Sequence, residues 1–237
     1  MLALIPELDY GAEELLMKLA ARAPNSVLDF FESRLARVIC DIDEERFEAI
    51  PFQFHHLNPS HVSVDATVAR AFAWYLQDRP LFPYRGGRFI ANLFPTLSAE
   101  LQKSLLTILE GSDPERLGFV IKLLQSYNGG TFLQPLCKAL VTALPSGDDR
   151  LEDVKHILFS TGVVRGEFGF VDVYLEKQRD LSDWIGDQDE SISSFARSAT
   201  ADLDKMIAGE RRRAEEARQL RQRSYQIPDA EDDPIGQ

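Results

Sequence analysis

The sequence lacks several features that would point to a known class of chemistry. Only two of its 237 residues are cysteines, Cys40 and Cys137. Both lie in apolar helical patterns without a Cys-x-x-Cys spacing, so we expect buried free thiols. No apolar run is long enough to cross a membrane, and the first residues do not join a basic region to an apolar core. We therefore expect a soluble, cytoplasmic protein with neither a membrane span nor a signal peptide.

Catalytic motifs are missing as well. Neither Gly-x-Ser-x-Gly nor Gly-x4-Gly-Lys-Ser/Thr occurs. His156 falls in the middle of a predicted helix, where a half-exposed residue is the simplest interpretation. The neighbouring carboxylates Asp148 and Asp149, and also Asp202 and Asp204, are best explained as helix caps and solvated charges. We assign no catalytic residue and no cofactor, and we predict that the chain is not an enzyme.

Basic residues are fewer than acidic residues in this chain. Lys and Arg number 26 against 38 Asp and Glu, which gives a formal net charge of −12. Proteins that bind the phosphate backbone of a nucleic acid usually carry a basic surface. The balance therefore argues against general nucleic-acid binding.

The clearest pattern that is present lies in residues 98–162, where four amphipathic helices are predicted. Ser98 caps the first, and Asp113 caps the second, which opens with proline and glutamate. The residues expected to face inward recur at helical spacing; they are Leu101, Leu105, Ile108 and Leu109, then Leu117, Val120, Ile121 and Leu124, then Leu133, Leu136, Cys137, Leu140, Val141 and Leu144, and finally Leu151, Val154 and Leu158.

The third and fourth of these helices repeat the first two. Thr131 and Gln134 have the spacing of a capping box, and Asp148 or Asp149 begins the fourth helix. Starts of alternate helices are 33 and 35 residues apart by this assignment. A helix-pair period in that range predicts a repeat architecture.

Shorter helices are predicted nearer the N-terminus. Residues 1–9 are apolar and belong either to the end of a preceding helix or to a native start packed on the first helix. A helix from 12 to 23 ends before Pro24, and Asn25 or Ser26 caps the next. The apolar faces expected in this part are Leu15, Leu16, Leu19 and Ala23; Val27, Phe30, Phe31, Leu35 and Val38; Val68, Ala71, Phe72, Tyr75 and Leu76; and Phe89, Ile90, Leu93 and Phe94. Trp74 lies off its stripe and is predicted to pack on a second neighbour.

Two irregular segments interrupt this pattern. Residues 41–63 hold His55, His56 and His61, whose spacing does not match a zinc site, so we predict no metal there. Residues 79–89 end in Tyr-Arg-Gly-Gly-Arg-Phe. Two interpretations stay open for this segment: a plain turn with exposed arginines, or an anion site between the guanidinium groups of Arg85 and Arg88.

The last third carries a second glycine-rich turn, residues 165–170, and then a long helix. The helix opens at residues 187–190, and its apolar stripe is Ile192, Phe195, Ala199, Leu203 and Met206 or Ile207. Beyond Gly209 the stripe fades into a segment with six arginines. That segment is either a solvated helix or an arm that docks on a partner; the partner-binding residues in the second case are Arg211, Arg212, Arg213, Arg218 and Arg221.

The closing pattern carries a resemblance to a known kind of protein. Trp184, Phe195, Ala196 and the Glu-Arg-Arg-Arg-Ala stretch resemble the C-terminal HEAT-like region of large multidomain bacterial proteins. The resemblance covers roughly residues 98 to 225. In such proteins this region often follows an NTPase or effector domain, and several are thought to act in defence against phage. The resemblance implies a recognition or scaffold module.

Together these patterns predict an all-α, right-handed solenoid of antiparallel helical hairpins, HEAT/ARM-like, with a long C-terminal helix. Its predicted parts are an N-terminal hairpin (1–40), an irregular insertion (41–63), a helical-repeat domain (64–226) and a disordered acidic tail (227–237). The predicted function is recognition of a protein partner. Two alternatives are a small-ligand or phosphate-binding protein that uses residues 50–90, and a nucleic-acid-sensing subunit.

Overall fold

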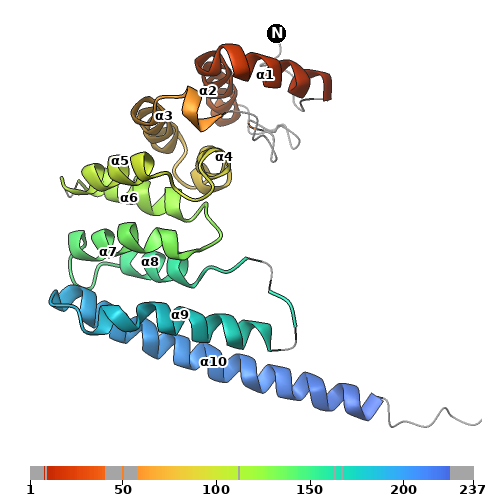
Figure 1. Cartoon of the computed structure of the whole chain (residues 1–237), viewed down its shortest axis with the longest axis vertical. Coiled ribbons are helices and arrows are strands. Elements are labelled where there is room, and N and C mark those ends of the chain that lie inside the picture. The colour runs from red at the N-terminus through yellow and green to blue at the C-terminus, as the bar shows by residue number, and fades with distance from the viewer. Residues whose placement is uncertain are drawn as a thin grey trace, which may run out of the picture. The chain divides into compact units, whose positions relative to one another are not determined.

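The computed structural model describes residues 8, 10–40, 50, 58–111, 113–162, 164–166 and 168–224, and every regular element in these ranges is a helix (Figure 1). The predicted all-α class is therefore confirmed for the described residues. The α-helices are α1 (Tyr10–Arg22), α2 (Pro24–Cys40), α3 (Val64–Gln77), α4 (Gly86–Leu93), α5 (Ala99–Leu109), α6 (Pro114–Leu124), α7 (Gln134–Ala143), α8 (Arg150–Phe159), α9 (Gly169–Ile185) and α10 (Glu190–Ser224). Short 3-10 helices lie between them: η2 (Pro59–His61), η3 (Phe82–Tyr84) and η4 (Thr131–Leu133). Among the described helices, none has the length and apolar character that a membrane crossing requires.

The chain divides into two compact units, Met1–Ser160 with α1 to α8 and Thr161–Gln237 with α9 and α10. The division falls inside the helical-repeat domain predicted for residues 64–226. The predicted domain bounds stay predictions.

Part of the predicted irregular segment can be described. Within residues 41–63 the structure describes Ile50 and residues 58–63, which include η2. The remainder of that segment and the predicted tail at 227–237 lie outside the described residues.

Helices of the first unit form two layers. In one layer α3 packs on α5 and α5 on α7; in the other α4 packs on α6 and α6 on α8. The pairs α3/α4, α5/α6 and α7/α8 connect the layers, and Figure 1 shows them stacked in chain order. Helices α5 and α6 thus contact the helical pairs before and after them.

Side-chain caps mark the starts of α5 and α6. The Ser98 hydroxyl accepts a hydrogen bond from the Leu101 amide at 3.2 Å, and the Asp113 carboxylate accepts two from the first turn of α6 at 3.0 Å. Both predicted caps are confirmed. The capping box predicted from Thr131 and Gln134 is wrong, because Thr131 begins η4 and α7 starts without a side-chain cap.

An aromatic cluster lies at the centre of the first unit. The Phe119 ring lies 5.3 Å from the Phe72 ring, 5.8 Å from Tyr75 and 5.7 Å from Phe82, measured between centroids. Phe119 is fully buried on α6. Burial of such a side chain stabilises the fold by about 1.5–3 kcal/mol. The cluster joins α3, η3 and α6, and so it fixes the position of the turn that precedes α4.

The inward faces predicted for residues 98–162 are buried, apart from Ile108 and Leu151, which are half-buried.

The face predicted for α1 is largely wrong. Leu15 is 51% exposed and Leu19 is 37% exposed, while the buried side consists of Ala12, Leu16 and Ala20. This side packs against α2. Its small alanine side chains allow the two helix axes to approach closely.

One aromatic residue of α3 replaces a predicted core leucine. Leu76 is 45% exposed, whereas Trp74 is buried and its ring lies 6.0 Å from that of Phe89 on α4. The predicted second neighbour of Trp74 is therefore α4.

The second unit is an antiparallel pair, α9 and α10. The Trp184 ring lies 6.3 Å from that of Phe195, and Gln178 Nε2 donates a 2.7 Å hydrogen bond to Asp204. Helix α9 was not predicted, because its buried positions are widely spaced and a glycine-rich stretch precedes it. The predicted cap region before α10 is confirmed, since Asp189 accepts a 2.9 Å hydrogen bond from the Ser191 amide.

Candidate functional site

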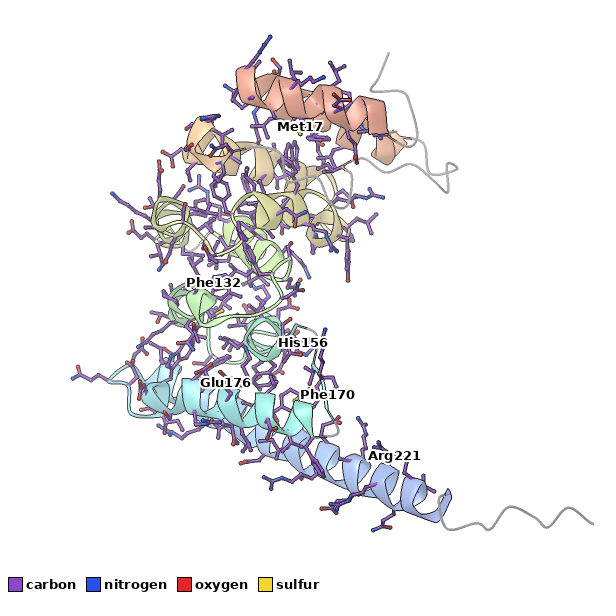
Figure 2. The ribbon with its side chains drawn as sticks, turned by 45° about the vertical axis from the view of Figure 1, so that its right-hand side comes forward. Met17, Phe132, His156, Phe170, Glu176 and Arg221 are labelled. Carbon is purple, nitrogen blue, oxygen red and sulfur yellow. The ribbon has the colours of Figure 1, made fainter. Side chains whose placement is uncertain are left out.

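A cavity of about 490 Å³ lies within the first unit, between the turn before α4, the C-terminal end of α6 and the end of α8. We call it the basic groove. Its lining includes Tyr84, Arg88, Lys122, Gln125, Ser126 and His156. Figure 2 shows His156 on α8 with its side chain directed away from the helix.

A close backbone approach brings the walls of the groove together. A Cβ atom at Gly87 would lie 2.3 Å from Ser126 Oγ and 3.0 Å from the carbonyl oxygen of Phe82. A side chain at position 87 would require Ser126 Oγ to rotate away and the Phe82 carbonyl to shift, so glycine suits this close packing of the start of α4 against the end of α6. The contact places Arg88, the next residue, beside the last turn of α6.

Side-chain hydrogen bonds hold the far wall in position. Lys122 Nζ donates to Gln125 Oε1 at 2.9 Å, and Gln125 Nε2 donates to Asp153 Oδ1 at 2.8 Å. This chain of contacts connects the end of α6 to α8. Because the last carbonyl groups of a helix carry partial negative charge, the ammonium group of Lys122 is also favoured in the last turn of α6.

The buried side chain of Tyr127 forms part of the lining of the groove. The Tyr127 hydroxyl donates a 3.0 Å hydrogen bond to the carbonyl oxygen of Phe94, and burial raises the pKa of Tyr127 well above its ordinary value. Tyr127 therefore lines the groove as a neutral side chain.

The charge of the lining differs from that of the whole chain. Arg88, Lys122 and His156 line the groove, and no Asp or Glu belongs to the described residues that line it. The chain as a whole has a formal net charge of −12. The groove is thus a locally basic surface in an acidic protein, and it favours anionic groups.

The predicted anion site between Arg85 and Arg88 does not form as one cluster. Arg85 pairs with Asp78 at 3.0 Å and lines a separate cavity of about 10 Å³, while Arg88 lines the basic groove. The predicted Gly-Gly turn is wrong, because Gly86 and Gly87 are the first two residues of α4 and both are buried. The side chains of Phe82 and Trp74 pack closely against Gly86, where an added Cβ would lie 3.1 and 3.0 Å from them.

The histidines considered for a metal site are only partly described. His61 lies in η2 and is exposed, while His55 and His56 lie outside the described residues. Within the part of the chain that the structure describes, no group of three His, Cys, Asp or Glu side chains is placed to hold a metal ion.

The five arginines predicted to bind a partner are all exposed on α10; they are Arg211, Arg212, Arg213, Arg218 and Arg221. Arg213 pairs with Glu210 at 2.7 Å on the helix surface. Phe170 lies at one end of α9. Figure 2 shows Arg221 on the part of α10 that continues beyond this end.

Sequence reasoning missed Lys122 and His156 as site residues. A signal for them exists, since Arg88, Lys122 and His156 are each 34 residues apart, which is one helix-pair period. They occupy the second helix of three successive hairpins, α4, α6 and α8. Stepping the repeat period from Arg88 would have found them.

Comparisons with family models, with curated proteins and with solved structures gave no match to this chain.

Proposed function

We propose that this chain is a non-catalytic protein-interaction module, an α-solenoid that recognises a partner protein through the end of its long C-terminal helix. The two-layer order of α3 to α8 supports the solenoid part of this proposal. The observation that carries the recognition part is the continuation of α10 beyond the helix on which it packs.

The projecting segment begins where the buried stripe of α10 stops. Helix α10 has 35 residues and α9 has 17, so an antiparallel pair leaves much of α10 unmatched. Burial raises the pKa of Tyr174 above its ordinary value, and the charge of Glu210 adds to the effect, which places the N-terminal part of α9 beside Glu210. Ala214 is the last buried residue described on α10. We call residues 215–224 the α10 arm.

The surface of the arm suits an acidic partner. The face of α10 that packs on α9 continues beyond Ala214 through Ala217 and Arg221, with Arg218 beside it. Leu220 at the edge of this face is 64% exposed. The arm holds three arginines and two glutamates, which leaves a formal net charge of +1. This basic excess beside one exposed leucine fits a negatively charged segment that presents an apolar residue, and electrostatic complementarity would speed their association.

An affinity purification of the full chain from its source organism would supply partner candidates, and a matched pair of variants would test them. The test variant is Arg218→Gln/Arg221→Gln, and the control Arg197→Gln/Lys205→Gln removes two charges from the part of α10 that lies along α9. We expect the Kd of a purified partner, measured by calorimetry, to rise at least about tenfold for the test variant only. Equal affinities for both variants would show that the arm is not the recognition element.

A second candidate function, binding of a small anionic ligand, is favoured by the volume of the basic groove. About 490 Å³ is within the range of small-molecule sites. The association with bacterial defence or NTPase systems rests on the resemblance alone and stays a prediction.

A further inference from the structure

We infer that the basic groove is a second protein-binding site, which takes an acidic segment of a partner protein in extended conformation. The carboxylates of that segment contact Arg88, Lys122 and His156 in turn. The site lies wholly within the first unit, so it is independent of the α10 arm.

The repeat geometry sets the spacing of the three basic residues. Each comes from the second helix of a successive hairpin, and α6 packs on both α4 and α8. Axes of packed helices are about 8–10 Å apart. An extended peptide in the polyproline II conformation has three residues per turn and advances about 3.1 Å per residue, so side chains three positions apart lie on one face, about 9 Å apart. Carboxylates at every third position of an extended segment therefore match one basic residue per hairpin.

The charge and setting of the groove favour such a segment. Lys122 is held by Gln125, which is in turn fixed by Asp153, so the ammonium group is positioned before a ligand arrives. The Asp153 carboxylate takes part in this chain of contacts, and its Oδ1 accepts the hydrogen bond from Gln125. A bound carboxylate therefore meets the ammonium group of Lys122 without an acidic residue among the lining.

The other lining residues suit a peptide main chain. Ser126, Asn128 and Ser160 supply hydroxyl and amide groups that can pair with peptide N–H and C=O groups. Tyr84 stands at the rim with 75% of its surface exposed, beside Pro83. Exposed tyrosine is enriched at protein interfaces, where its ring packs and its hydroxyl stays hydrated.

The test uses the full chain and two synthetic peptides of identical composition. In one peptide three glutamates occupy every third position, and in the other they are contiguous. Binding is measured by fluorescence anisotropy at low salt, where exposed charges are least screened. We expect the spaced peptide to bind more tightly and its affinity to fall when salt is raised.

Variants then locate the contact. Lys122→Gln is expected to weaken binding of the spaced peptide by about fivefold, the size typical of one partly exposed ion pair. His156→Ala removes one hydrogen-bonding group and is expected to weaken it by about threefold. The control Lys103→Gln removes an exposed charge from α5 in the other layer and is expected to leave the Kd unchanged. Circular dichroism verifies that each variant keeps its helix content.

Three outcomes would overturn the inference. Equal binding of the two peptides would exclude the proposed spacing. Saturable binding of inorganic phosphate or pyrophosphate that Lys122→Gln abolishes, with no peptide binding, would identify a small-anion site. Tighter peptide binding by the full chain after replacement of Asp229, Glu231, Asp232 and Asp233 by their amides would identify the chain's own acidic tail as the occupant.

Discussion

Gln125 Nε2 donates a 2.8 Å hydrogen bond to Asp153 Oδ1, and this contact joins the C-terminal end of α6 to α8 within one layer of the first unit. It also fixes the amide that holds Lys122. One polar pair thus links the stacking of two hairpins to the shape of the basic groove.

The Gln125–Asp153 contact can be measured by a double-mutant cycle. We expect Gln125→Ala and Asp153→Ala each to lower the free energy of unfolding, with a coupling of about 1 kcal/mol between them, because a charge-assisted hydrogen bond is lost once and not twice. Urea titrations of the unsubstituted chain, the two single variants and the double variant supply the four values. Strictly additive losses would show that the pair contributes nothing to stability.

Gly87→Ala tests the close approach of α4 to the end of α6. The new Cβ would lie 3.0 Å from the Phe82 carbonyl oxygen and closer still to Ser126, so we expect a loss of about 1–3 kcal/mol in the free energy of unfolding. Gly111→Ala is the matched control, because nothing lies within 4 Å of its added Cβ. Chemical denaturation of both variants makes the comparison. A similar effect of both would indicate that the approach tolerates a methyl group.

Asp113→Ala removes the cap of α6. The carboxylate accepts hydrogen bonds from the amides of Glu115 and Arg116, so its removal is expected to cost about 1 kcal/mol of stability. Asp149→Ala serves as the control, since the Asp149 side chain makes no cap hydrogen bond at α8. Thermal unfolding of the two variants should show a lower Tm for Asp113→Ala alone.

The contact between Asp148 and Arg150 predicts that the free energy of unfolding falls in acid. Hydrogen bonds from the Arg150 side chain, at 2.9 and 2.7 Å, lower the pKa of Asp148 from 3.8 to about 2. Because the folded-state pKa lies below the ordinary value, the stabilisation is present above about pH 4 and is lost as pH falls toward about 2.

Asp148→Asn is therefore expected to be less stable than the unsubstituted chain at pH 7, and the difference should shrink as the pH approaches 2. Urea midpoints measured across this range follow the difference. A gap that stays constant with pH would mean that the carboxylate does not stabilise the folded state through its charge.

Local patterns predicted much of the helical structure, because helix starts and stripes depend on residues close in sequence. Ser98 and Asp113 cap the helices that they were expected to cap, and the stripe from Leu133 to Leu144 is buried throughout. Where a local pattern allowed two structures, prediction failed. The Thr131–Gln134 spacing fits a capping box and equally a 3-10 turn, and the structure has the turn.

The sequence by itself determined an all-α chain with a helix-pair period and an acidic net charge. Only the tertiary structure decided which sides of the helices are buried, as Leu15 and Trp74 show, because the side that faces a neighbour depends on that neighbour's position. The same holds for the basic groove. Its three basic residues are far apart along the chain, and the packing of α6 on both α4 and α8 brings them to one cavity.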